Sequence, residues 1–216
     1  MRELLWTIIG LAGGVRAVSR SRVRVRTLRR SGKVFGEGHL TDLKMATPIA
    51  ASIGALIFFL ASQKLIDDWE MVAYGILIWK CLQLVLIDID THVLPRVMIL
   101  STLVIGVGAM LLASLTGADG SVITMGVGSV GMWAILKVLE VVSRGDLGGG
   151  DVTLGLLLGA YLGWGGLVQI PIALIVAFLS AGLTAVVLLV ARRANRRTML
   201  PFGPFLIFGT LVAVIR

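Results

Sequence analysis

The chain has 216 residues, of which 57% are hydrophobic and only 15% charged, and its formal net charge is +8. A soluble domain has about 45–50% apolar and about 25% charged residues, so this composition excludes an ordinary soluble domain and makes the bilayer the expected solvent. The single cysteine, Cys81, excludes an internal disulfide and a zinc site built on a Cys-x-x-Cys pair.

Eight apolar runs follow one another along the chain, and a crossing helix needs about 20 apolar residues. We expect helices over 4–18, 46–61, 71–87, 97–115, 122–142, 152–164, 167–190 and 202–215. The first and sixth runs are the shortest, and we expect the first to be a retained span because it is not followed by a small-x-small cleavage site. The sequence therefore predicts an all-α integral membrane protein, with residues 1–216 forming a single polytopic bundle of about eight transmembrane helices.

Lysine and arginine in the loops predict the orientation of this bundle. Eight spans place fifteen of these residues on one side and three on the other, with Lys80 and Lys137 inside spans. The richer side has a basic loop at about 19–44, the single residues Arg96 and Arg144, and a cluster at 192–197, and we expect it to be cytoplasmic. Since every basic cluster lies on this side, we interpret the net charge as a topology determinant that contacts membrane lipids, with no nucleic acid as a partner.

Carboxylates beside membrane spans are costly and indicate functional sites. Asp88 and Asp90 lie at the cytoplasmic end of the third run, and Asp151 follows three glycines at the cytoplasmic start of the sixth. Two close carboxylates in a low-dielectric site share one proton, so that one draws a proton from water while the other polarises a carbonyl. This chemistry hydrolyses a peptide bond without a metal. The glycines alone are also typical of a flexible turn.

Three further features have simpler interpretations. Lys137 and Glu140 are three residues apart on a helix and can pair, and Glu70, Asp67, Asp68 and Asp119 lie on the outer side, where we expect solvation. Asp146 is typical of a loop charge. Gly155, Gly159 and Gly163 form a small-residue seam, which we expect to pack the protein's own helices in preference to docking a substrate. Lys80, near the middle of the third run, is open to snorkelling, pairing or lining a wet cavity.

Three stretches together resemble the type IV prepilin peptidase family of GxGD-type membrane aspartyl proteases, over about residues 70 to 215. They are Leu86-Ile87-Asp88-Ile89-Asp90-Thr91-His92-Val93-Leu94-Pro95, Gly148-Gly149-Gly150-Asp151-Val152-Thr153-Leu154 and Leu200-Pro201-Phe202-Gly203-Pro204-Phe205-Leu206. The resemblance implies that Asp88 and Asp151 are the catalytic pair, that Gly148 and Gly150 are the glycines of GxGD, and that Asp90 only adds polarity.

The resemblance also implies the reaction. An intramembrane aspartyl endopeptidase would remove the leader peptide of type IV pilin-like precursors at the cytoplasmic face of a prokaryotic inner membrane, with no cofactor or metal. The chain departs from the family at Thr153 and Arg96, where lysine and an acidic residue are usual. The loop at about 19–44 also lacks the Cys-x-x-Cys pairs of larger members. We therefore expect S-adenosylmethionine only if methyl transfer to the new N-terminus is retained.

Two other classes remain open from the sequence. A small ion- or proton-coupled transporter also places aspartates beside broken helices, although no internal repeat is visible. A catalytically inactive assembly factor of a pilus or secretion system would fit the departures at Thr153 and Arg96, whereas the retention of both Asp88 and Asp151 argues against it.

Overall fold

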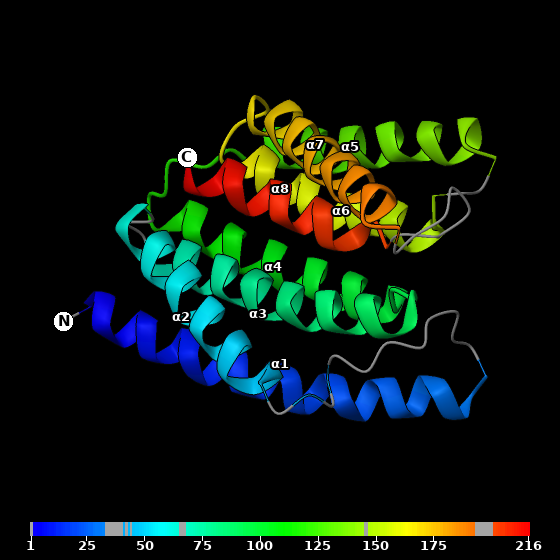
Figure 1. Ribbon diagram of the computed structural model, residues 1–216. Helices are drawn as coiled ribbons and strands as arrows, with labels where there is room; N and C mark the ends of the chain where they lie inside the picture. Colours follow the sequence, from blue (N-terminus) through cyan, green and yellow to red (C-terminus); the bar gives the residue numbers. More distant parts are fainter. Residues whose placement is uncertain are drawn as a thin grey trace.

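The computed structural model describes residues 2–32, 41, 43, 45–64, 68–144, 147–192 and 201–216, and in these ranges the only regular structure is helical. Eight helices run roughly parallel to one long axis (Figure 1). They are α1 (Arg2–Arg30), α2 (Ala46–Lys64), α3 (Asp68–Thr91), α4 (Arg96–Leu115), α5 (Val122–Val142), α6 (Gly149–Trp164), α7 (Gln169–Val190) and α8 (Gly203–Ile215).

The all-α membrane fold is confirmed. Five helices (α2, α3, α4, α5 and α7) are long and apolar enough to cross a bilayer, and α8 is a shorter apolar helix. The bounds of α2 to α8 agree with the expected runs to within a few residues, because apolar stretches end where charged residues or Gly and Pro begin. For α1, α6 and α8, a complete crossing stays a prediction.

The first helix is much longer than we predicted. The expected run ended at residue 18 and gave way to a basic loop, but α1 continues through the arginines to Arg30. Its inner face explains why: Val18, Ser21 and Val25 are buried at helical spacing, and Val18 packs in one cluster with α2 residues. Arginine is also a good helix former. Of the expected loop at 19–44, residues 33–40, 42 and 44 lie outside the described residues.

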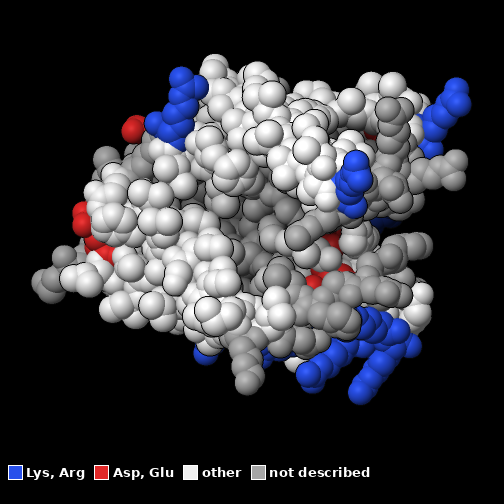
Figure 2. Space-filling model, in the orientation of Figure 1, with Lys and Arg blue, Asp and Glu red and all other residues white. Residues whose placement is uncertain are grey.

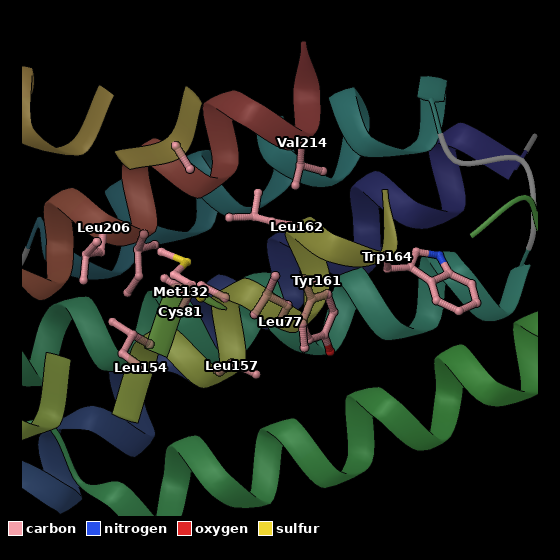
Figure 3. Packing of buried hydrophobic residues seen from close by; sticks show 14 of the residues in the cluster. Leu77, Cys81, Met132, Leu154, Leu157, Tyr161, Leu162, Trp164, Leu206 and Val214 are labelled. Carbon is pink, nitrogen blue, oxygen red and sulfur yellow. The ribbon is translucent and has the colours of Figure 1, made fainter. Parts of the chain in front are cut away.

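The core of the bundle centres on α6, the most buried helix. Figure 3 shows its side chains Leu154, Leu157 and Tyr161 packed among residues of the neighbouring helices α3, α5 and α8. The predicted small-residue seam faces α5: a Cβ added to Gly128 of α5 would come within 2.5 Å of the carbonyl oxygen of Gly159. The seam therefore packs the protein's own helices, as predicted, and is not open to a substrate.

Charge is unevenly distributed between the two ends of the bundle. Both termini lie at one end, at the left of Figure 1. Most of the basic side chains seen in Figure 2 gather toward the opposite, right-hand end, whereas acidic side chains appear both on the left-hand rim and in the right-hand half. The C-terminal end of α3 and the N-terminal end of α6, which carry Asp88 and Asp151, lie at this right-hand end. We call this end the basic end and the other the outer end.

Candidate active site

Two aspartates from different helices occupy the basic end of the bundle. Asp88 lies in the last turn of α3 and Asp151 in the first turn of α6. The two helices run in opposite directions, so the end of one meets the beginning of the other. Both side chains are buried, with Asp88 only 4% and Asp151 only 8% exposed. A buried carboxylate is retained only where partners or function offset its desolvation.

The start of α8 brings the two carboxylates together. A Cβ added to Gly203 would lie 2.7 Å from Oδ2 of Asp88 and 3.4 Å from Oδ1 of Asp151, so both oxygens face the same point on the backbone. The two oxygens can be no farther apart than the sum of these distances. Only glycine leaves room for both carboxylates at this position.

These same two oxygens have no hydrogen-bond partner. Oδ2 of Asp88 and Oδ1 of Asp151 are buried, and neither receives a hydrogen bond from the described part of the chain. The backbone of Gly203 lies beside the Asp88 carboxyl group and that of Gly148 beside the Asp151 carboxyl group. The two facing oxygens are thus left able to bind a water or a substrate group.

The glycines before Asp151 have separate structural roles. Gly148 caps α6 in an extended conformation and its carbonyl oxygen accepts the N–H of Asp151 at 2.9 Å. Gly150 faces the segment that follows α3, because an added Cβ would lie 2.8 Å from Cβ of Leu94. The same Leu94 side chain reaches Gly203, with its Cδ1 3.0 Å from the added Cβ position. Leu94 therefore packs between the starts of α6 and α8.

Asp90 is a buried structural residue, whereas we expected it only to add polarity to a loop. It is completely buried and accepts two hydrogen bonds from Thr41, one from the backbone N–H at 3.0 Å and one from the hydroxyl at 2.6 Å. The carbonyl oxygen of Thr41 in turn accepts a hydrogen bond from the guanidinium of Arg22. Asp90 thus ties the segment between α1 and α2 to the end of the helix that carries Asp88.

The outer end of the α3 and α6 pair is closed by hydrogen bonds. The hydroxyl of Tyr161 donates to the backbone carbonyl oxygen of Ala73. The hydroxyl of Tyr74 donates to the backbone carbonyl oxygen of Tyr161, and both distances are 3.0 Å. The two rings meet edge to face, with centroids 5.3 Å apart. Nε1 of Trp164 donates to Oε1 of Glu70 at 2.6 Å. The expectation that Glu70 is merely solvated was therefore wrong, whereas Asp68 and Asp119 are exposed as expected.

The two departures from the family pattern take local partners. The hydroxyl of Thr153 donates to the carbonyl oxygen of Gly149 at 2.8 Å within α6. The guanidinium of Arg96 lies across Gly149, since an added Cβ there would be 2.6 Å from one of its terminal nitrogens. The predicted pair between Lys137 and Glu140 is confirmed, with Nζ 2.5 Å from Oε2. Asp67 and Asp146 lie outside the described residues.

Sequence reasoning missed the roles of Gly203 and Thr41. Gly203 stood within a recognised motif, but the motif indicated only the start of the last helix. Nothing in the local sequence connects Thr41 with Asp90, because 49 residues separate them. Across the described residues, no group of three or more histidine, cysteine or acidic side chains is arranged to hold a metal ion.

The fold and the site together define a class: a polytopic helical membrane protein with two buried aspartates, from different helices, facing each other at one end of the bundle. Comparison with known proteins narrows this class. The model of the type IV leader peptidase family matches residues 75–190, and the chain belongs to this family. No solved structure matches the chain.

Curated relatives in several bacteria carry the name prepilin leader peptidase/N-methyltransferase. The chain is 29% identical to the one from Pseudomonas aeruginosa over 148 residues, which cover 68% of this chain and 50% of the relative. It is 27% identical to that of Aeromonas hydrophila over 169 residues, covering 78% and 57%. With that of Pseudomonas putida the identity is 31% over 140 residues, covering 64% and 48%. The chain thus spans about half the length of the relatives it matches.

Proposed function

We propose that this protein is an aspartyl endopeptidase that removes the leader peptide of type IV pilin-like precursors, with Asp88 and Asp151 as its catalytic pair. One observation carries the proposal: the two unpartnered, buried oxygens of these carboxylates face the same point beside Gly203. Membership of the type IV leader peptidase family and the names of the relatives support the substrate class.

The helix ends favour different roles for the two aspartates. Asp151 lies in the first turn of α6, where the partial positive charge of the helix N-terminus stabilises an anion. Asp88 lies in the last turn of α3, where the opposite end of the dipole disfavours one. We therefore assign the shared proton to Asp88 and the role of general base to Asp151.

The reaction then needs only these two carboxyl groups. Asp151 takes a proton from a water molecule, and the resulting hydroxide adds to the scissile carbonyl carbon while Asp88 donates its proton to the carbonyl oxygen. The tetrahedral intermediate collapses as the C–N bond breaks, and Asp151 passes its proton to the leaving amine. The carboxyl pair returns to a singly protonated state once Asp88 recovers its proton from the hydroxyl of the intermediate.

An apolar groove leads from the site along the bundle. It has a volume of about 670 Å³ and lies between α2, α3 and α8, beginning at Val85 and Pro204 beside the aspartates and ending at Ile215. Figure 2 shows a hollow on this face, with acidic side chains visible at its right-hand end. A precursor with an apolar helix after its leader would lay that helix in the groove and present the preceding peptide bond to the carboxylates.

The distribution of charge supports a site that faces the cytoplasm. The aspartates lie at the basic end of the bundle, and basic loops face the cytoplasm in inner-membrane proteins. We therefore propose a multi-pass protein of the prokaryotic inner membrane that cleaves its substrate at the cytoplasmic interface.

The proposal is limited to proteolysis and does not extend to methyl transfer. The relatives whose names include N-methyltransferase are about twice as long as the part of this chain that matches them, so the proposal keeps to the reaction that the two aspartates can perform.

Co-expression with a pilin-like precursor tests the proposal, with the leader followed by the mobility of the precursor on a gel. We expect Asp88→Asn and Asp151→Asn to abolish processing, because each removes one of the two proton-exchanging groups. Asp119→Asn is the matched control, since Asp119 is exposed at the outer end. Immunoblots of the membrane fraction establish that the variants accumulate normally. Processing that survives either active-site substitution would refute the catalytic assignment.

A further inference from the structure

A pocket lined by basic side chains lies between α1, α3 and α4, apart from the two aspartates. Arg20, Arg24 and Lys80 line it together with Gln83, and its volume is about 590 Å³. No acidic side chain of the described residues lines it. Three cations in one pocket repel each other unless an anion lies between them. We call this cavity the basic pocket.

Two donor atoms of the basic pocket lack acceptors. Nε of Arg24 and Nε2 of Gln83 are buried and have no hydrogen-bond partner in the described ranges of the chain. Gln83 is only 2% exposed, so bulk water does not satisfy its amide group. Each such donor costs free energy comparable to a lost hydrogen bond, and more when it is charged. An anion with several oxygen acceptors would satisfy both side chains and neutralise part of the charge.

An apolar pocket continues the basic pocket along the same groove. It has a volume of about 370 Å³ and is lined by residues including Trp6, Ile9, Phe58, Ile76 and Trp79. On α1 the lining positions 9, 13, 16, 20, 23 and 27 recur every three or four residues, so they follow one face of the helix from the apolar into the basic pocket.

Trp79 marks the junction between the two pockets. It lines the apolar pocket, while the guanidinium of Arg20 and the ammonium of Lys80 from the basic pocket lie 5.6 and 5.2 Å from the centre of its ring. The lining of the groove therefore changes from apolar to cationic at Trp79. A ligand that fills both parts must be amphiphilic, with an anionic head and an apolar chain.

We propose that this groove binds an anionic phospholipid, with its phosphate in the basic pocket and an acyl chain in the apolar pocket. The position of the basic pocket along the bundle fits a lipid headgroup. Its wall includes Met98, which lies in the first turn of α4 at the basic end of the bundle. From there the apolar pocket extends toward the outer end, in the direction of the acyl chains. Free phosphate would satisfy the donors but leave the apolar pocket unfilled.

This ligand also gives Lys80 a role. Its position within α3 left its function open, and in the structure its ammonium lines the basic pocket beside Trp79. Arg24 of α1 and Lys80 of α3 would contact one phosphate from opposite sides. The lipid would thereby join α1 to the helix that carries Asp88.

Brominated lipids test this proposal directly, because bromine on an acyl chain quenches tryptophan fluorescence at contact. The purified full-length protein in neutral detergent is titrated with phosphatidylglycerol carrying brominated chains, and in parallel with phosphatidylcholine carrying the same chains. We expect saturable quenching by phosphatidylglycerol at concentrations at which phosphatidylcholine has little effect. Trp79→Phe should remove a large part of the saturable quenching.

Charge variants identify the headgroup contacts. Lys80→Gln and Arg24→Gln should each weaken the apparent affinity for phosphatidylglycerol about tenfold, the effect of one lost hydrogen bond to a charged group. Lys80→Arg should retain binding and shows whether a loss in Lys80→Gln reflects misfolding. Arg26→Gln removes the same charge from an exposed position of α1 and is the matched control.

Three results would overturn the proposal. Equal quenching by phosphatidylcholine would mean that the groove does not select an anion. Equal weakening by Arg26→Gln would mean that diffuse surface charge attracts the lipid. Loss of the phosphatidylglycerol preference in millimolar inorganic phosphate, with chloride at equal ionic strength as reference, would mean that the basic pocket binds a free anion. None of these results bears on cleavage of the precursor, which is measured separately.

Discussion

The two ends of the α3 and α6 pair differ in how their polar groups are satisfied. At the outer end, Tyr74, Tyr161 and Trp164 all donate hydrogen bonds across the pair, and the tyrosine rings pack edge to face. At the basic end, Asp88 and Asp151 each keep one buried oxygen without a partner in the described chain.

This difference shows how a membrane protein can retain buried carboxylate oxygens that have no hydrogen-bond partner. Unpaired buried carboxylates favour separation or rearrangement of the helices that carry them. Hydrogen bonds at the opposite end tie the same two helices together and so oppose their separation. The hydrogen-bonded end of the pair thus supports the geometry of the end that carries the two aspartates.

The largest effect is expected when the space between the carboxylates is filled. Gly203→Ala places a methyl group 2.7 Å from Oδ2 of Asp88, closer than real contacts allow. We expect processing of the precursor to fall about a hundredfold, because a displacement of about 1 Å at reacting groups has an effect of that size. Gly182→Ala in α7 is the control, since an added Cβ there meets nothing within 4 Å. Normal processing by Gly203→Ala would mean that the two oxygens are not the reactive ones.

A smaller effect is expected at the partnered aspartate. Asp90→Ala leaves the Thr41 hydroxyl and backbone N–H without their buried acceptor, which should lower the free energy of unfolding by about 1–3 kcal/mol. Thermal unfolding in detergent measures this loss. Processing by the folded fraction should continue, in contrast to Asp88→Asn. If Asp90→Ala abolished processing at normal stability, Asp90 would belong to the reactive pair.

Substitutions at the outer end of the α3 and α6 pair should change the stability of the protein more than its processing of the precursor. Tyr161→Phe removes the hydrogen bond to Ala73 and should lower the free energy of unfolding by about 1 kcal/mol. Tyr74→Phe should have a similar effect, and the double variant reports whether the two bonds are coupled. Thermal midpoints provide the measurement. A large loss of processing with an unchanged midpoint would contradict a purely supporting role for this end.

The smallest effect is expected at a partly exposed ion pair within α5. Lys137→Gln removes the ion pair with Glu140, whose side chains are 49% and 21% exposed, respectively. Such pairs contribute about 0.2–1 kcal/mol, and often nothing measurable. We expect neither the thermal midpoint nor processing to change beyond experimental error. A clear loss would reveal a role for this surface that the structure does not suggest.

Much of the fold could be predicted from the sequence, because a bilayer imposes its preference on each residue separately. Runs of apolar residues gave the positions of α2 to α8, and the motifs gave Asp88, Asp151 and the glycines before α6 as candidates. The same reasoning ended α1 too early, since a count of arginines does not reveal the buried stripe of Val18, Ser21 and Val25 on the opposite face. The three- and four-residue spacing of these positions was the signal in the sequence that would have extended the helix.

The sequence by itself determined that the chain is a helical membrane protein with carboxylates at the ends of two apolar runs. Only the tertiary structure decided which oxygens of Asp88 and Asp151 face each other, that Gly203 makes room for them, and that Asp90 is bound to Thr41. The physical reason is that solvent preference is a property of each residue, whereas hydrogen-bond partners depend on packing between segments far apart in the chain. Lys80 illustrates both, since its cost in a membrane span was evident at once and its neighbours Arg20, Arg24 and Trp79 were not.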